Sequence, residues 1–248
     1  MKRNEMKLLF AVMFSVALIF GMSACAKRAV PDDTIATATA TATTAVGGTT
    51  VDNFEGYADT TALLNTGNPT FWALDLATFT GAITLNTTAP HNGTKDILMT
   101  VDLPTSTGWL PAATMDMMPN AAAGSEFNAT SGSTGLRFWV KSSPGTTAAA
   151  NLNFMVAVRT TNITDYSYWR KKAIPFSTTW TQISIPWTAF ARPDWGKSPA
   201  AQGDDAGVTT FANTMSVIQG YRFIIAVNIA TSMSTTGAYL EIDNLETY

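Results

Sequence analysis

The sequence predicts an all-β fold, a jelly-roll β-sandwich, over residues 51–248. Short runs alternate apolar and polar residues, most strictly at 136–141 (L-R-F-W-V-K) and 151–159 (N-L-N-F-M-V-A-V-R). Turn-forming stretches such as 142–145 (S-S-P-G) separate these runs. No segment sustains a helical period for more than a turn. Many short strands joined by turns are typical of a sandwich or jelly roll.

The other strands are expected in the same way. Alternating runs predict strands at 51–57, 82–85, 97–103, 221–230 and 237–245, and short helical turns are expected at 60–64 and 209–215. Two further runs, 168–176 and 181–187, are separated by S-T-T at 177–179. Two alternating runs with a short polar turn between them predict an antiparallel hairpin.

Composition excludes one class of partner. Of the 248 residues only 13% are charged, about half the usual quarter, and the net charge is −3. Nucleic-acid binding needs a basic surface, and this balance supplies none. Exported β-rich proteins often have such a composition.

The N-terminus predicts export. Residues 1–24 read as a signal peptide: a mostly basic start, an apolar run at 8–20 that is too short to span a bilayer, and small residues before position 25. Cys25 is the only cysteine, so a disulfide within the chain is impossible. Residues 25–50 are rich in Thr and Ala and predict a flexible tether.

The M-S-A-C sequence at 22–25 resembles the lipobox of bacterial lipoproteins. This resemblance implies acylation of Cys25 and a membrane anchor in the bacterial cell envelope, because several acyl chains hold a protein firmly. Ala26, rather than Asp, is compatible with sorting to the outer membrane of a Gram-negative cell. The alternative is an ordinary signal peptide with an incidental cysteine.

A loop at 192–196 (R-P-D-W-G) brings Arg192, Asp194 and Trp195 close together in sequence. A sugar ring stacks its C–H face on an aromatic ring, and charged side chains form strong hydrogen bonds with its hydroxyls. The alternative is a tryptophan packed on the sandwich beside a surface ion pair that contributes little.

An ordered set of motifs resembles the family 11 carbohydrate-binding modules, which have a galactose-binding-like fold. The motifs are D-N-F-E-G (52–56), L-R-F-W-V-K-S (136–142), N-F-M-V-A-V-R (153–159), W-T-Q-I-S-I-P-W-T-A-F (180–190), R-P-D-W (192–195) and E-I-D-N-L (241–245). The resemblance covers residues 51–248. It implies a jelly roll whose concave face binds single β-glucan chains, notably mixed-linkage ones.

The resemblance also implies site residues. Arg192, Asp194 and Trp195 fall on the cleft's Arg, Asp and aromatic positions. The remaining sugar-binding candidates lie near a cleft carboxylate and platform aromatics: Asp165, Tyr168 and Trp109. The pattern departs at Ile225, where a cleft tyrosine is expected, and at Gln219, where an acidic residue is expected, so substrate preference can differ.

Other aromatic and basic residues are assigned less specifically. Trp139 and Phe154 lie mid-strand and are expected in the core, and Trp72 fits either core or cleft. Arg137 and Arg159 lie on strands of which one face could line the cleft.

Three carboxylates suggest a structural calcium ion. In related jelly rolls the first and last strands run side by side, which would bring Asp52 and Glu55 near Asp243. Calcium takes six to eight oxygen ligands, so backbone carbonyls would supply most of them. The alternative is that these side chains cap the sandwich edge through hydrogen bonds alone.

Catalysis is not expected. The single histidine, His91, lies in a turn-like loop and is expected to be exposed, and no G-x-S-x-G motif occurs. Glu126 and Glu241 have no context that supports a glycosidase pair. The sequence therefore predicts a non-catalytic lipoprotein that holds β-glucan-like polysaccharide at the cell envelope. A module that binds envelope proteins and a polysaccharide-cleaving enzyme are the alternatives.

Overall fold

The computed structural model describes residues 49–68, 70–106, 112–119, 133–160, 169–191, 218–227 and 233–248. By its internal contacts the chain divides into two units, 1–44 and 45–248, and every described residue belongs to the second. No helix within the described ranges is long and apolar enough to cross a membrane.

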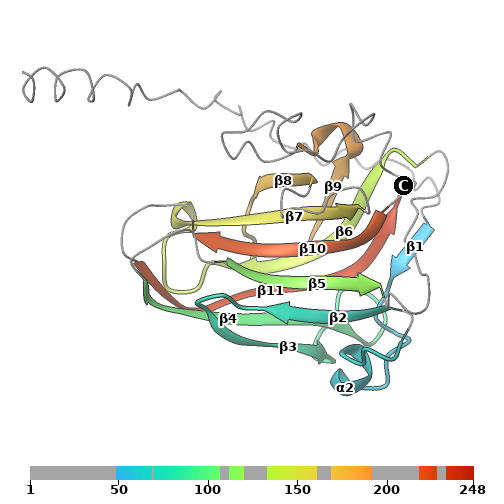
Figure 1. Ribbon diagram of the computed structural model, residues 1–248, viewed down its shortest axis with the longest axis horizontal. Helices are drawn as coiled ribbons and strands as arrows, with labels where there is room; N and C mark the ends of the chain where they lie inside the picture. The colour runs from blue at the N-terminus through green and yellow to red at the C-terminus, as the bar shows by residue number, and fades with distance from the viewer. Residues whose placement is uncertain are drawn as a thin grey trace, which may run out of the picture. The chain divides into compact units, whose positions relative to one another are not determined.

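The described strands form two antiparallel sheets, packed one over the other in Figure 1. The six-stranded sheet has the order β3 (Thr80–Asn86), β4 (Asp96–Ser106), β11 (Met233–Thr247), β6 (Gly135–Ser143), β9 (Thr181–Pro186), and β1 (Thr49–Asp52) pairs with β11. The five-stranded sheet has the order β2 (Thr70–Asp75), β5 (Ala112–Pro119), β10 (Ile218–Val227), β7 (Leu152–Thr160), β8 (Trp169–Ile174). The predicted jelly-roll sandwich is confirmed.

Within the residues that the structure describes, helical structure is confined to short pieces: α2 (Thr60–Leu63) and two 3-10 turns at Ala149–Asn151 and Trp187–Ala189. Asp59 caps α2 by accepting a hydrogen bond from the backbone N–H of Ala62 at 2.8 Å. The helical turn predicted at 60–64 is therefore present. The one predicted at 209–215 lies outside the described residues.

The core lies between the inner faces of the two sheets. Phe138 from β6 meets Phe223 from β10 edge to face, with ring centroids 5.1 Å apart. Phe154 is fully buried, as predicted. Trp72 from β2 is 1% exposed and packs between Phe54 and Phe223, so it belongs to the core. Such pairs add to the hydrophobic stabilisation of the interior.

The two ends of the described domain are joined by strand pairing. Thr49 of β1 lies opposite Thr247 of β11, and the backbone N–H of Gly135 donates to the carbonyl of Tyr248. The first and last strands therefore run side by side, as the family resemblance implied.

The hairpin predicted from 168–176 and 181–187 is wrong. β8 pairs with β7 in the five-stranded sheet, whereas β9 pairs with β6 in the six-stranded sheet. Residues 175–180 cross between the sheets, and the N–H of Ser142 donates to the carbonyl of Ser177 at 2.6 Å on the way. The alternation of each run predicts a half-buried strand but not its partner. The connection is long enough to span the roughly 10 Å between packed sheets.

Trp139 was predicted in the core and lies instead on the outer face of the six-stranded sheet. Along β6 the side chains of Leu136, Phe138, Val140 and Ser142 are fully buried, and the residues between them are half-buried. Because successive side chains of a strand point to opposite faces, Trp139 shares its face with Arg137 and Lys141. Arg137 therefore lines the six-stranded sheet, where it pairs with Glu246 at 2.7 Å.

Candidate functional site

The predicted sugar-binding residues lie outside the described part of the chain: Trp109, Asp165, Tyr168, Arg192, Asp194 and Trp195, together with Cys25. Two described residues that lie close in sequence to these positions pair with each other. Arg170 of β8 and Ala191 exchange backbone hydrogen bonds of 2.9 and 3.0 Å. The residues next to 161–168 and 192–217 are thus adjacent at the β8 edge of the five-stranded sheet.

The outer face of the five-stranded sheet carries a polar pair at its centre. Strand register aligns one row across all five strands: Ala73, Asp116, Arg222, Ala157 and Arg170. In the middle of this row Arg222 donates through Nε and Nη2 to the two carboxylate oxygens of Asp116, the Nη2–Oδ2 distance being 2.6 Å. The side chain of Arg222 is only 14% exposed and that of Asp116 only 9%. This two-pronged geometry is the strongest form of ion pair and is directional.

The electrostatics of this pair result from opposing effects. Burial raises the pKa of Asp116, and the hydrogen bonds and charge of Arg222 oppose that rise. Arg159, in the next row of β7, adds a second positive charge that acts in the same direction as Arg222. Arg159 lies opposite Gly220 and donates through Nη1 to the sulfur of Met118 on β5. Because Gly220 has no side chain, it leaves room for Arg159 to reach across β10.

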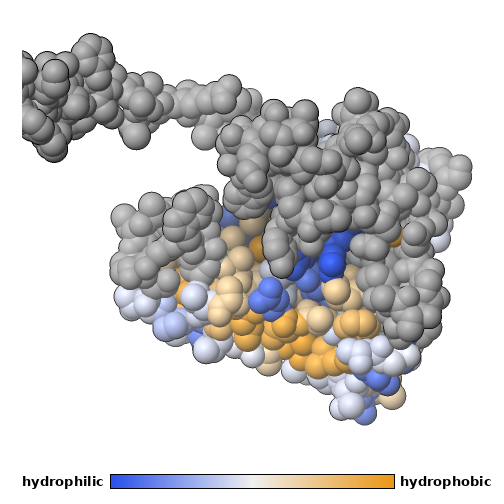
Figure 2. Space-filling view, viewed as in Figure 1, coloured by the Kyte–Doolittle hydropathy of each residue, from blue (hydrophilic) through white to orange (hydrophobic). Residues whose placement is uncertain are grey.

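Apolar side chains border the polar pair. Phe71, Met118 and Ile224 are half-buried on the same face, and Figure 2 shows hydrophilic residues near its middle with apolar residues beside them. Charged hydrogen-bonding groups set among apolar contacts are what a site for a hydroxylated, partly apolar ligand requires. A sequence signal existed for Asp116, a single charge in the apolar run A-A-T-M-D-M-M-P, but its partner Arg222 lies 106 positions away.

The three carboxylates predicted to bind calcium are occupied by protein donors. Asp52 accepts from the backbone N–H of Phe54 at 2.8 Å and from Tyr57 Oη and Trp72 Nε1, each at 2.9 Å. Burial raises the pKa of Asp52, and these hydrogen bonds oppose the rise. Asp52 therefore joins β1 to the turn that follows it and to the core tryptophan.

Glu55 and Asp243 hold the loop between β3 and β4. Glu55 accepts from the hydroxyl and the N–H of Thr94, each at 2.7 Å, and from the N–H of Lys95 at 2.9 Å. The bond from the Thr94 hydroxyl is the main reason why the pKa of Glu55 is lowered. Asp243 accepts from the N–H of Asn92 at 2.7 Å, and burial raises its pKa. The three side chains thus bind different backbone groups.

These residues do not fit a shared calcium site. Among the described residues no group of three or more His, Cys, Asp or Glu side chains is placed to hold a metal ion. The ammonium group of Lys95 already donates to the carbonyls of Tyr57 at 2.6 Å and Glu55 at 3.3 Å. A calcium ion would need such carbonyls as ligands. The geometry favours the alternative in which hydrogen bonds alone cap the sandwich edge.

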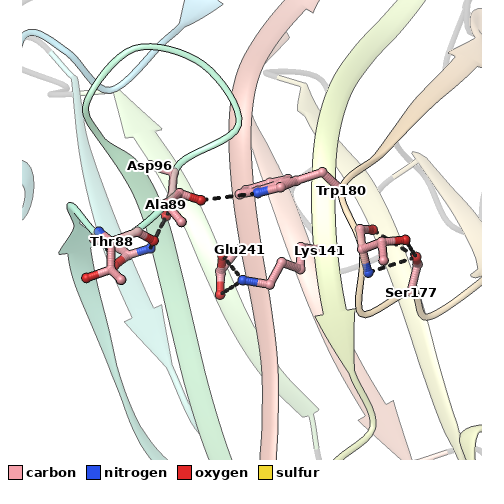
Figure 3. Close-up of polar contacts among 9 residues, drawn as sticks. Thr88, Ala89, Asp96, Lys141, Ser177, Trp180 and Glu241 are labelled. Carbon is pink, nitrogen blue, oxygen red and sulfur yellow. Dashed lines mark hydrogen bonds and ion pairs between the residues drawn. The ribbon is translucent and has the colours of Figure 1, made fainter.

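His91 was expected to be exposed and is half-buried on the six-stranded sheet. Its ring stacks on Trp139 with centroids 3.6 Å apart and an interplanar angle of 15°, and its edge meets Trp180 at 5.8 Å. The indole N–H of Trp180 donates to the carbonyl of Ala89 at 3.3 Å (Figure 3). Nothing in the local sequence A-P-H-N-G predicts this packing, because both tryptophans lie on distant segments.

Beneath this loop lies a cluster of charged groups. Lys141 Nζ donates to both carboxylate oxygens of Glu241 at 2.9 Å, and Asn86 Nδ2 donates to both oxygens of Asp96 at 3.0 and 3.1 Å. Asp96 is fully buried, and this burial is the main cause that raises its pKa to about 7. The nearby charges of Glu241 and Asp243 raise it further.

Comparison with known proteins identifies the family. The sequence profile described as "Carbohydrate binding domain (family 11)" matches residues 36–247. The chain belongs to this family. No curated protein sequence matches the chain.

The solved structures that resemble this chain include family 11 domains. One, from Clostridium thermocellum in complex with a β-1,3-1,4-mixed-linked tetrasaccharide, is 19% identical over 82% of this chain and 96% of its own, with a TM-score of 0.50. Another, from the cellulosomal cellulase Lic26A-Cel5E of the same organism, is 18% identical over 82% and 95%, with a TM-score of 0.49. At this identity the first likeness shows the fold alone.

Position 225, where a cleft tyrosine was expected, does not lie on the outer face of this family 11 domain. Ile225 is fully buried and faces the core, so the outward-facing residues beside it on β10 are Ile224 and Ala226. Neither is aromatic. The outer face therefore has no stacking ring on this part of β10. The side chain of Gln219 lies outside the described residues.

Proposed function

We propose that this family 11 domain is non-catalytic and binds a β-glucan-like polysaccharide on the outer face of its five-stranded sheet. The observation that carries the proposal is the Asp116–Arg222 pair, set at the centre of that face in a chain that matches a carbohydrate-binding family over residues 36–247. The mixed-linked tetrasaccharide held by the similar domain from Clostridium thermocellum supports this ligand class.

The binding mechanism uses directional polar contacts within an apolar surround. Arg222 presents guanidinium N–H groups and Asp116 presents carboxylate oxygens, which suit neighbouring sugar hydroxyls. The apolar side chains of Phe71 and Ile224 contact C–H groups of the sugar. From the adjoining segments the proposed contributors are the residues that the family resemblance implies: Trp109, Asp165, Tyr168, Arg192, Asp194 and Trp195.

The absence of catalysis is supported by what the candidate acids do. Glycoside hydrolysis requires two carboxyl groups that flank the scissile bond. The carboxylate of Asp116 is paired with Arg222, and the carboxylate of Glu241 is paired with Lys141 on the other sheet, so these two carboxylates do not flank one site. Release of reducing ends from glucan or xylan by the purified protein would contradict this part of the proposal.

The proposed location is the bacterial cell envelope, with the domain held to a membrane through acylated Cys25 and the 25–50 tether. The M-S-A-C sequence at 22–25 supports it. Cys25→Ala is expected to move the protein from the membrane fraction to the soluble fraction. A wild-type protein that is soluble after export would overturn the anchor without affecting the glycan site.

Isothermal titration of the full chain with mixed-linkage, 1,3-linked and 1,4-linked glucan oligosaccharides and xylan fragments tests the binding proposal. Trp195→Ala and the paired variant Asp116→Leu/Arg222→Met are expected to lose about 1–3 kcal/mol or more of binding free energy. Arg137→Met is a matched control, since it breaks a similar ion pair on the other sheet.

Two results would overturn the proposal. If the variants bind as tightly as the wild type, the outer face of the five-stranded sheet is not the site. If the wild type binds none of these sugars, a protein partner becomes the better hypothesis, because the fold serves other ligands as well.

A further inference from the structure

Aromatic side chains on the sheet surfaces gather on the face opposite the candidate site. Within the described residues, Phe71 is the one aromatic side chain on the outer face of the five-stranded sheet. The outer face of the six-stranded sheet has four half-buried aromatic residues: Trp139, Trp180, Tyr239 and Tyr248. Sugar stacking needs aromatic faces, so this distribution calls for an explanation beyond the site already described.

Two of these rings flank an ion pair. Lys141 Nζ lies 5.8 Å from the centroid of the Trp180 ring and 2.9 Å from both carboxylate oxygens of Glu241 (Figure 3). Tyr239 precedes Glu241 by two positions on β11, so it lies on the same face about 7 Å along the strand. Tyr239, Glu241, Lys141 and Trp180, here called the Trp180–Tyr239 surface, thus alternate aromatic and hydrogen-bonding groups.

Tyr239 is not explained by the stability of the fold. Trp180 also anchors the loop between β3 and β4 through Ala89 and His91. The side chain of Tyr239 is half-buried and forms no hydrogen bond within the described residues, and the side chains opposite it, Thr100 and Ser143, are small. Its ring and hydroxyl are therefore available to a ligand.

The charges on this surface indicate the kind of ligand. Lys141 and Glu241 neutralise each other, and the hydrogen bond that Lys141 donates to Glu241 is the main cause that raises the pKa of Lys141, which keeps it charged. A paired cation and carboxylate neither attract nor repel a charged ligand strongly. They offer both donors and acceptors to hydroxyl groups beside two aromatic rings.

We propose that the Trp180–Tyr239 surface is a second glycan-binding surface for a neutral polysaccharide chain. It lies on the opposite side of the sandwich from the Asp116–Arg222 pair, so one domain holds two chains at once. Such a bivalent domain crosslinks polysaccharide and binds long chains more tightly than short ones, because the second contact forms at high effective concentration.

The test uses the full chain in two measurements. Isothermal titration with short glucan oligosaccharides is expected to give two ligands per wild-type chain. Mixing with long glucan is expected to precipitate it, since only a bivalent protein crosslinks chains. Tyr239→Ala and Trp180→Ala are expected to reduce the stoichiometry to one, to weaken the second site at least about tenfold, and to abolish precipitation.

Matched variants separate the two sites and exclude unfolding. Tyr248→Ala removes a tyrosine directly after the end of β11, about 25–30 Å from Tyr239 along the strand direction, and is expected to leave both measurements unchanged. Trp180→Ala also removes the contacts that hold the loop between β3 and β4. The wild-type side chain of Tyr239 makes no such contact, so Tyr239→Ala is the decisive variant. Asp116→Leu/Arg222→Met is expected to leave one ligand per chain, held by the Trp180–Tyr239 surface alone.

Several results would overturn the inference. One ligand per wild-type chain, wild-type behaviour of Tyr239→Ala, or no glycan binding at all each contradict it. A dimer of the sugar-free wild type that Tyr239→Ala dissociates in sedimentation would show that a second copy covers this surface instead. If Asp116→Leu/Arg222→Met binds no glycan while the wild type does, the proposed function stands and only the second glycan-binding surface is excluded.

Discussion

The imidazole ring of His91 lies flat against the indole of Trp139, with ring centroids 3.6 Å apart. This stack joins the loop between β3 and β4 to β6, two strands away in the six-stranded sheet. Hydrogen bonds to two carboxylates hold the same loop. The backbone N–H of Asn92 donates to Asp243, and the backbone N–H groups of Thr94 and Lys95 donate to Glu55. Gly93 makes the turn between them: its φ is +68°, and a Cβ there would lie 2.3 Å from Glu55 Oε1. The loop is therefore clamped across the outer face of the sheet at several points.

Removing the imidazole ring of His91 is expected to weaken the attachment of this loop to the sheet. His91→Ala should lower the free energy of unfolding by about 0.5–1.5 kcal/mol, the usual contribution of an aromatic pair beyond simple burial. Urea unfolding followed by tryptophan fluorescence measures it. Asn92→Ala is the control, because Asn92 contributes its backbone N–H and not its side chain. Equal stability of His91→Ala and the control would show that the stack is incidental.

Asp96 is expected to make stability depend on pH. Its folded-state pKa of about 7 lies above the ordinary value of 3.8, so between these values the native state binds a proton that the unfolded state lacks. The free energy of unfolding therefore falls as pH rises from about 4 through about 7. Asp96→Asn should remove this loss and raise stability at pH 8 by about 1–4 kcal/mol.

Urea unfolding at acidic, neutral and alkaline pH checks the role of Asp96. A profile for Asp96→Asn that is parallel to that of the wild type would place the titration on another group.

Breaking the Asp116–Arg222 pair from one side should cost more than removing both partners. Arg222→Met leaves a buried carboxylate without its cation and should lower the free energy of unfolding by about 3–5 kcal/mol. Asp116→Leu/Arg222→Met should recover much of this loss. A double-mutant cycle in urea measures the coupling, and additive single effects would mean that the two side chains act independently.

Calcium is expected to leave the melting temperature unchanged. A site that included Asp52, Glu55 and Asp243 would stabilise the folded state through mass action. These carboxylates already accept hydrogen bonds from the protein, and the ammonium group of Lys95 donates hydrogen bonds to two nearby backbone carbonyls. Thermal unfolding with excess calcium and with a chelator provides the check. A rise in Tm with calcium that Asp243→Asn abolishes would establish the ion.

The sequence alone determined the fold class and the positions of several strands. Alternation at 136–141 and 151–159 is a local property that each strand carries in its own residues, and the structure confirms both strands. The ordered motifs were sufficient to indicate the family, because motif order along the chain needs no knowledge of contacts.

Only the tertiary structure decided which residues meet. Alternation separates the two faces of a strand, but it does not say which face is covered, so Trp139 was assigned to the wrong side. Strand partners depend on the whole topology, which is why 168–176 and 181–187 were joined in a hairpin although they belong to different sheets. The pairs Asp116–Arg222 and His91–Trp139 join positions far apart in the chain, and no local pattern encodes a contact that depends on how two sheets are ordered.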